Sequence, residues 1–293
     1  MTYANHGPGW HPELPNYLDA LVKNNADVDG IERDPIRFPR QWEPGPDREV
    51  VAIISALLSY GRAISIGTAI TEAVKRLGPE PSKSALTDSV HQAQQRFRSF
   101  YYRVTRGDDV ARVFLGLGAI LRQHGSMANA FSAWDESTAD FRPLLSRLRA
   151  EITEATPEFS RQRSFQHFLP DPARGSACKR YMMLMRWMVR GPDKVDLGDW
   201  SFLGPQRLTI PLDTHVHRIS RYLGLTARAS ADWKTAAEIT SPLRVFSPRD
   251  PVRYDFALAH LGISGACPTY REPRICSTCD LNSVCQLPVT KPR

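Results

Sequence analysis

The amino-acid sequence predicts an all-α fold. In most segments the apolar residues recur at helical spacing, and no stretch sustains the apolar–polar alternation of a half-buried strand. No internal repeat is visible. A chain of 293 residues can bury a large core, and we expect two lobes. Residues 46–190 would form a helical bundle, and residues 191–293 a second lobe on which the N-terminal segment 1–45 packs.

The N-terminal part is expected to contain three helices. Apolar residues from Tyr17 to Val22 are spaced for a short helix. The two prolines within residues 34–39 favour extended backbone. Asp47 can cap a buried helix that runs through the nearly continuous apolar residues 50–58. A further helix over residues 64–77 would end at the following Gly-Pro pair.

The remaining helices follow from the same spacing and from capping residues. Ser176 can cap a largely apolar helix over residues 176–190, in which Cys178 is expected to be a core residue. Asp213 opens an amphipathic helix that ends at Gly224. Other helices are expected over residues 109–123, 126–134, 141–154, 232–243 and 254–261.

The composition is that of a basic globular protein. The formal net charge is +7 and the sequence pI is about 9.3, which favours a polyanionic partner. No apolar run approaches the ~20 residues that span a bilayer, and the N-terminus lacks a secretion signal. We therefore expect a monomeric cytoplasmic protein without membrane association.

Four of the five cysteines lie close together near the C-terminus, as Cys267-x8-Cys276-x2-Cys279-x5-Cys285. Thiolates at this spacing suit a tetrahedral site for an iron–sulfur cluster or for Zn²⁺, and the spacing does not select between them. Disulfides are the alternative, which a reducing compartment disfavours.

Residues 97–107 mix aromatic residues with arginines. Tyr101 and Tyr102 could stack on nucleic-acid bases while Arg103 and Arg106 hold phosphate. The same composition fits a half-buried turn, with its aromatic residues in the core and its arginines on carboxylates. Composition alone favours the turn.

The cysteine loop resembles that of the endonuclease III group of helix-hairpin-helix DNA glycosylases. In that group four cysteines with the same second and third gaps hold a [4Fe-4S] cluster, whereas the first gap is eight residues here and six there. The resemblance implies that the four C-terminal cysteines hold this cluster, with Zn²⁺ as the alternative. It also implies that Arg271 and Arg274 in the longest gap contact DNA phosphate, unless they are only solvated.

The centre of the chain resembles the catalytic segments of the same superfamily. Leu212-Asp213-Thr214-His215 is similar to the V-D-T-H segment in which a catalytic aspartate opens a helix. Leu169-Pro170 resembles the start of the family hairpin, and Lys179 stands where bifunctional members have a nucleophilic lysine. Asp171 and Ala173 replace hairpin glycines, and the interval from lysine to aspartate is closer to that of archaeal 8-oxoguanine glycosylases.

Most of the chain, residues 31–285, also looks like a widespread bacterial family that is usually described as uncharacterised and placed in this superfamily. The resemblance implies a two-lobed helix-hairpin-helix glycosylase fold with a C-terminal four-cysteine loop. It places Lys179 on one lobe and Asp213 on the other, with DNA between the lobes. The similar segments are residues 34–39, 57–62, 100–107, 175–180, 186–190 and 211–216.

The implied chemistry explains the residue types. Cleavage of an N-glycosidic bond builds positive charge on the sugar, and the Asp213 carboxylate would stabilise this charge or activate the attacking nucleophile. A neutral Lys179 could attack C1′ and form a Schiff base. Gly175 and Ser176, at a helix start, could seat a phosphate. An extruded base needs stacking faces, for which the candidates are Tyr60, Tyr101, Tyr102 and Trp187.

The resemblance therefore implies a DNA glycosylase that excises a modified or damaged base, and an abasic-site lyase as well if the lysine attacks the sugar. A non-catalytic DNA-binding or lesion-sensing protein on the same scaffold is the alternative. A zinc protein with a purely structural cysteine loop is the third hypothesis. The identity of the base, its single- or double-stranded context and RNA as a target stay open.

Overall fold

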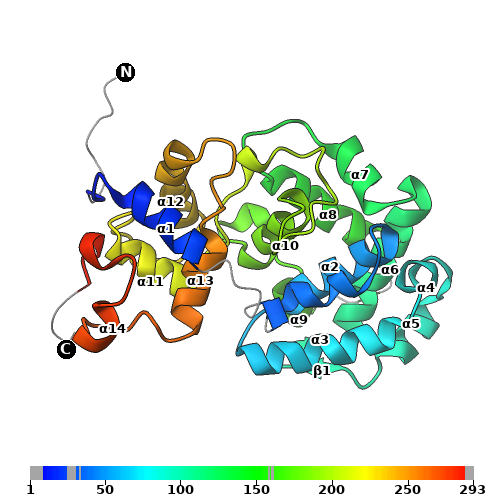
Figure 1. Ribbon diagram of the computed structural model, residues 1–293. Helices are drawn as coiled ribbons and strands as arrows, with labels where there is room; N and C mark the ends of the chain where they lie inside the picture. Colours follow the sequence, from blue (N-terminus) through cyan, green and yellow to red (C-terminus); the bar gives the residue numbers. More distant parts are fainter. Residues whose placement is uncertain (1–8, 25–30, 33, 158, 160–161, 288–293) are drawn as a thin grey trace. The chain divides into compact units, whose positions relative to one another are not determined.

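The computed structural model describes residues 9–24, 31–32, 34–157, 159 and 162–287 (Figure 1). In this part of the chain the elements are helical apart from one ribbon of two short strands, so the all-α expectation is confirmed. The chain forms two compact units that interleave along the sequence. Unit 1 comprises Met1–Asp27, Gly175–Met182 and Leu208–Arg293, and unit 2 comprises Val28–Arg174 and Met183–Arg207.

Unit 2 is a bundle of helices around a central one, α6 (Gly107–His124), which is buried along most of its length. The helices that pack on it include α2 (Pro46–Leu58), α4 (Pro81–Thr87), α5 (Val90–Phe97), α7 (Met127–Trp134) and α8 (Arg142–Glu154). The unit also contains η2 (Pro35–Arg37), η3 (Pro39–Gln41), α3 (Ala63–Leu77), α9 (Arg163–Phe168), η4 (Pro172–Arg174), η5 (Pro205–Arg207), and the strands β1 (Tyr101–Tyr102) and β2 (Thr105–Arg106).

Glycines on α6 let its neighbours approach the helix backbone. A Cβ on Gly107 would lie 1.9 Å from the carbonyl oxygen of Phe97, and one on Gly118 would lie 1.9 Å from that of Ala85. Real Cβ atoms do not come this close to backbone, so any side chain at these positions would push α5 or α4 away. The dense core of unit 2 therefore depends on glycine here, despite its low helix propensity.

Two local expectations in unit 2 were wrong. Asp34 is extended, but residues 35–37 form η2 and Pro39 begins η3, so that each proline occupies the first position of a short helix. The fixed φ of proline suits that position, where its missing N–H costs nothing. Asp47 does not cap α2, because Gly45 is the N-cap. Asp47 instead accepts a hydrogen bond from the backbone N–H of Ser82 at 2.7 Å, at the start of α4.

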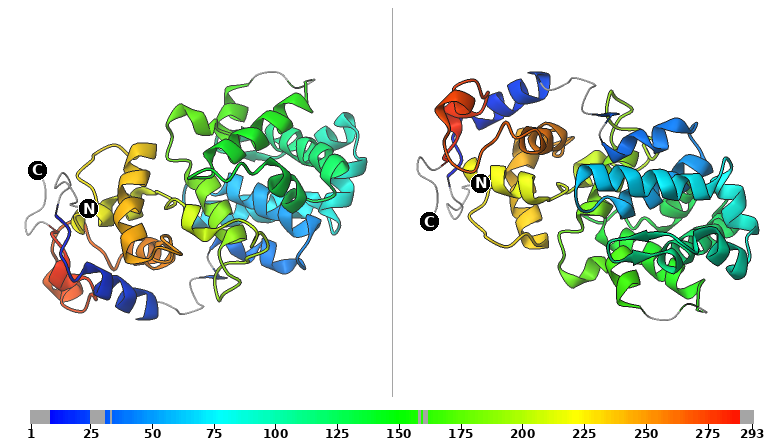
Figure 2. Two further views of the ribbon diagram at one scale, coloured as in Figure 1. Left: turned by 90° about the horizontal axis from the view of Figure 1, so that it is seen from above. Right: turned by 90° about the horizontal axis from the view of Figure 1, so that it is seen from below.

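Unit 1 is built from helices at both ends of the chain. Figure 1 shows α11 (Thr214–Tyr222) packed beside α13 (Asp255–Ile263), and Figure 2 shows α1 (Leu14–Asn24) near α13 from two further sides. The apolar face of α1 is formed by Leu14, Leu18 and Leu21, which are buried. The unit also contains α12 (Trp233–Phe246), α14 (Pro273–Cys276), η6 (Asn282–Val284) and the first turn of α10 (Lys179–Val189).

The division of the chain differs from the expected one. Residues 175–182 and 208–293 form unit 1 with the N-terminal residues, whereas the bundle had been expected to continue to residue 190. Both Lys179 and Asp213 belong to unit 1, whereas the resemblance had placed them on different lobes. The helix predicted from Ser176 begins at Lys179, three residues later.

Candidate functional site

Asp213 lies at the N-cap of α11, as the sequence predicts. Its backbone is extended, and its Oδ1 atom accepts hydrogen bonds from the backbone N–H groups of His215 and Val216, both at 2.8 Å. The side chain is half-buried. Within the described residues, Oδ2 accepts no hydrogen bond. The cap therefore fixes the carboxylate through one oxygen and leaves the other able to face a substrate.

Lys179 is the first residue of α10 and is half-buried. The residue before it, Cys178, is buried and has a positive φ of 51°, which is rare for a residue with a side chain. Its N–H donates to Oγ of Ser176 at 3.3 Å. Backbone strain of this kind is common at functional sites, where surrounding structure holds it in place. The turn thus fixes the direction in which α10 begins.

A chain of polar contacts connects the turn before Lys179 to the helix that Asp213 opens. Trp233 N–H donates to the carbonyl of Gly175 at 3.0 Å, beside a backbone bridge between Ser176 and Asp232. Asp232 pairs with Arg228 at 2.7 Å. The Arg228 carbonyl lies 2.9 Å from Nε2 of His217, which is on α11. The starts of α10, α11 and α12 are therefore linked inside unit 1.

Gly175 and Ser176, the predicted phosphate seat, are exposed in this turn. His215 has a packing role: a Cβ on Gly262 of α13 would lie 2.5 Å from Cβ of His215. The absence of a side chain at position 262 thus lets α11 and α13 approach each other behind Asp213.

The four C-terminal cysteines are free thiols in unit 1. Burial is the main reason that the pKa of Cys267 rises to about 11; Arg218 lowers it, and the other three thiols raise it further. Burial likewise raises the pKa of Cys279 and of Cys285. In the part of the chain that the structure describes, no three His, Cys, Asp or Glu side chains are assembled as a metal-binding group. The donor chemistry, four cysteine thiols in one loop, is that of a thiolate centre.

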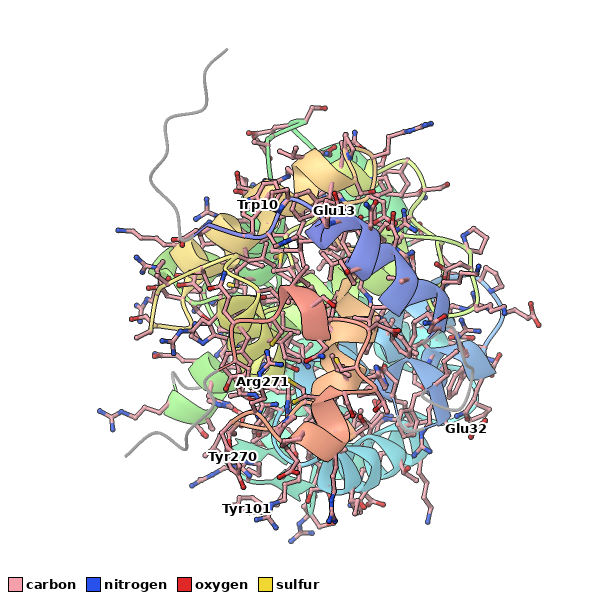
Figure 3. The ribbon with its side chains drawn as sticks, turned by 60° about the vertical axis from the view of Figure 1, so that its left-hand side comes forward. Trp10, Glu13, Glu32, Tyr101, Tyr270 and Arg271 are labelled. Carbon is pink, nitrogen blue, oxygen red and sulfur yellow. The ribbon has the colours of Figure 1, made fainter. Side chains whose placement is uncertain are left out.

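Arg271 closes the cysteine loop from within. Its Nη1 donates to Oδ1 of Asn282 at 2.6 Å and its Nη2 to the carbonyl of Cys285 at 2.9 Å. Figure 3 shows the side chains of Tyr270 and Arg271 in this loop. Both Nη atoms of Arg271 donate hydrogen bonds inside the loop. The side chain therefore stabilises the loop, whereas the sequence had suggested a contact with DNA phosphate. Arg274 is exposed, so its guanidinium is accessible to a phosphate group, as the prediction requires.

The aromatic candidates differ in exposure. Trp187 is fully buried and Tyr102 is 7% exposed, so neither presents a ring face to an extruded base. Tyr60 is half-buried. Tyr101 is 71% exposed on β1, and Arg103 and Arg106 of the same ribbon are exposed.

Two surface hollows flank Tyr101. The first, of about 360 Å³, is called the apolar hollow after Ile64, Ala69 and Phe100, although Glu72, Ser65, Thr68 and Ser99 also line it. The second, of about 590 Å³, is called the basic hollow after the arginines in its lining. Sequence reasoning missed Arg163 and His167 of α9, which line the second hollow, because they lie some sixty residues along the chain from the ribbon. Their proximity follows from packing of α9 on β2. Arg103, Val104, Arg106, Gln162 and Ser164 complete the basic hollow with Tyr101.

These features define an all-α protein of two interleaved units, with Lys179 and Asp213 at the starts of two helices in one of them. The chain belongs to the family described as "Protein of unknown function (DUF2400)", whose model matches residues 34–264. The match covers both residues and ends before Cys267. No curated protein and no solved structure matches the chain. Among the described residues, no helix has the length and apolar character needed to cross a membrane.

Proposed function

We propose that this protein is a DNA glycosylase that removes a modified or damaged base, with abasic-site lyase activity supplied by Lys179. The observation that carries the proposal is the placement of Lys179 and Asp213 at the starts of two helices of one unit, linked by the hydrogen bonds through Gly175, Asp232 and Arg228. A nucleophile and a carboxylate fixed in this way are the two groups that a glycosylase with lyase activity uses.

Asp213 would stabilise the positive charge that develops on the sugar as the N-glycosidic bond breaks. Its Oδ1 is held by two backbone N–H groups, so the side chain does not have to be ordered when substrate binds. The remaining oxygen, Oδ2, can face the sugar. A preorganised negative charge at this point favours the transition state over the ground state, because the sugar is neutral before the bond breaks.

Lys179 would act as the nucleophile. Its neutral amine attacks C1′, the C1′–N bond breaks, and the base departs with the bonding electron pair and takes up a proton. After the new ammonium loses a proton, the C1′–O4′ bond breaks, O4′ takes up a proton, and the nitrogen lone pair forms the double bond of a protonated Schiff base between Nζ and C1′. Loss of a C2′ proton with departure of the 3′ phosphate and its bonding electron pair then cleaves the strand. The strained turn at Cys178 fixes the first turn of the helix that carries this lysine.

The cysteine loop would hold a [4Fe-4S] cluster through Cys267, Cys276, Cys279 and Cys285, with Zn²⁺ as the alternative metal. Such a group supplies four metal–thiolate bonds that fasten the loop. The hydrogen bonds of Arg271 already hold Asn282 and Cys285 in the same loop. Arg274 would then present its charge to DNA phosphate from an ordered segment.

The test is borohydride trapping with DNA that carries a panel of modified bases and an abasic site. The wild type should form a covalent adduct, and Lys179→Gln should form none. Asp213→Asn should keep the fold, because asparagine is also a good N-cap, but lose base excision. Lys234→Gln is the matched control, since Lys234 is an exposed lysine near the start of α12 in the same unit and should trap normally. Trapping that survives Lys179→Gln would overturn the assigned nucleophile.

A non-catalytic DNA-binding role is the second candidate, and Asp171 favours it. Its Oδ1 accepts the N–H of Ala173 at 3.0 Å, and its Oδ2 lies 3.7 Å from the guanidinium of Arg174. The Asp171 carboxylate thus accepts a hydrogen bond from a hairpin N–H group that could otherwise donate to a phosphate. DNA binding without an adduct or base loss on any substrate of the panel would support this role over the enzyme.

A further inference from the structure

We propose that the β1–β2 ribbon and its two hollows form a binding site for unpaired nucleotides of a DNA strand. The site lies in unit 2 and does not include Lys179, Asp213 or the cysteine loop. The inference rests on the proposed function in one respect, the choice of DNA as the partner. It adds a prediction that the bound DNA is unpaired, a question that the sequence leaves open.

The charge of the basic hollow suits phosphate. Arg103, Arg106 and Arg163 line it and are exposed, and none of the described residues that line it is acidic. Within the described part of the chain, none of these arginines makes a salt bridge. Several described arginines elsewhere in unit 2 do pair with carboxylates, as Arg48 does with Asp199 at 3.1 Å. Unpaired guanidinium groups gathered around one hollow attract a polyanion.

Tyr101 supplies a flat apolar face between the two hollows. In the ribbon, Tyr101 pairs with Arg106 and Tyr102 with Thr105. Alternation along a strand directs Tyr102 inward, where it is buried, and Tyr101 outward, where it is 71% exposed. Figure 3 shows the Tyr101 side chain at the molecular surface. Ile64, which is 87% exposed, lines the apolar hollow with it. Together these two exposed side chains form a small apolar patch, and apolar patches of this kind can bind a partner.

A nucleotide has parts that match both hollows. Its base is flat and can stack on Tyr101 above the apolar hollow, and its phosphate can reach the arginines of the basic one. In a closed duplex the base faces are covered by neighbouring base pairs, so a protruding tyrosine finds no face to stack on. Bases of a single strand, or of a strand from which a base has been displaced, are exposed. An exposed tyrosine beside a group of arginines therefore favours binding of unpaired DNA over duplex DNA.

The site is held rigid by Asp109, which is buried under the ribbon. Its Oδ2 accepts the N–H of Arg106 at 2.8 Å, and its Oδ1 accepts the hydroxyl of Ser164 at 3.0 Å. One carboxylate thus joins β2, which carries Arg106, to α9, which carries Arg163. The two backbone segments that carry Arg106 and Arg163 are therefore held together before any ligand binds, which lowers the backbone entropy lost on binding.

Fluorescence anisotropy with the full chain tests the proposal, using a labelled single-stranded oligonucleotide and the duplex of the same sequence. Tyr101→Ala should weaken single-strand binding about tenfold or more and duplex binding little, whereas Tyr101→Phe should bind like the wild type because the ring is kept. Arg103→Gln and Arg163→Gln should each reduce the slope of log affinity against log salt by about 0.7 on the single strand. Arg122→Gln, an exposed arginine near the other end of α6, is the matched control and should change neither quantity.

Equal weakening of single-strand and duplex binding by Tyr101→Ala would overturn the preference for unpaired bases, and no effect of any ribbon variant would overturn the site itself. Stronger binding of the matching RNA strand, with the same dependence on Tyr101, would overturn DNA as the partner. Because anisotropy measures binding without excision, failure of borohydride trapping on Lys179 would leave this result unchanged. The two proposals can therefore fail separately.

Discussion

Tyr60 and Tyr102 each donate a phenolic hydrogen bond to the backbone carbonyl oxygen of the other. The bond from Tyr60 measures 2.9 Å, and the Tyr60 hydroxyl also lies 2.8 Å from Oγ1 of Thr105. The two rings are tilted against each other with centroids 5.0 Å apart. Gly61 is needed between them, because a Cβ there would lie 2.8 Å from the Tyr102 hydroxyl. This pair ties the end of α2 to the ribbon that carries Tyr101.

Replacing either tyrosine by phenylalanine should lower the free energy of unfolding by about 1 kcal/mol, since a part-buried carbonyl loses its donor. Because the two bonds hold the same segments together, the double variant should lose less than the sum of the single losses. Urea denaturation of the four proteins measures the coupling. Tyr101→Phe, on the exposed side of the same strand, is the control and should leave stability unchanged. Strictly additive losses would show that the two bonds act independently.

Gly262→Ala should destabilise the protein by about 1–3 kcal/mol, because the new Cβ would lie 2.5 Å from Cβ of His215. Alanine normally stabilises a helix interior relative to glycine. A loss of stability in this variant would therefore reflect the contact with His215 and not helix propensity. Gly67→Ala in α3 is the matched control: its nearest neighbour would be the flexible end of Arg37 at 3.3 Å, and stability should hold or rise. Thermal unfolding distinguishes the two. A stabilised Gly262→Ala variant would show that α11 and α13 are not in close contact there.

Acidic pH should remove the contribution that Asp135 makes to the free energy of unfolding. Arg207 holds this carboxylate at 2.7 and 2.6 Å, and these hydrogen bonds lower the pKa of Asp135. A folded-state pKa below the unfolded value means that the stabilisation is complete above about pH 4 and is lost as the pH falls through the folded-state pKa. Asp135→Asn should therefore cost about 2 kcal/mol at pH 7 and much less at pH 2.5.

Unfolding of Asp135→Asn and wild type across this pH range provides the measurement. Glu80→Gln is the control, because Glu80 pairs with Lys83 at an exposed position and should contribute less than about 1 kcal/mol. The same loss from Asp135→Asn at both pH values would rule out the ionic origin of the effect.

Removal of one cysteine should separate the metal hypotheses. A [4Fe-4S] protein absorbs broadly in the visible range, and Cys276→Ser should lose that absorption together with bound iron. Cys178→Ala should retain both, because Cys178 lies outside the loop. A colourless wild type that contains zinc and no iron would replace the cluster with Zn²⁺. Metal analysis of the purified proteins gives the answer.

Much of the helical framework could be predicted because long apolar periodicity leaves few alternatives. The buried run in α2 and the N-cap at Asp213 are local properties of the sequence, and both were confirmed. The ribbon could not be predicted, because each strand has only two residues, too few to form a recognisable apolar–polar pattern in the sequence. The proximity of Arg163 to Arg103 depends on packing between distant segments, as does the shared unit of Lys179 and Asp213. Local sequence patterns do not show which distant segments pack together, so these contacts could not be predicted.

The glycines of α6 also limit how the sequence can vary. Position 118 faces the carbonyl of Ala85 and position 107 that of Phe97, so every other amino acid would have to displace a neighbouring helix. The outward positions of the same helix, such as Arg122, carry no such restriction. In a library that randomises α6 and is selected for folded protein, glycine alone should be recovered at 107 and 118. These two positions would then be expected to mark remote members of the family even after most surface residues have diverged.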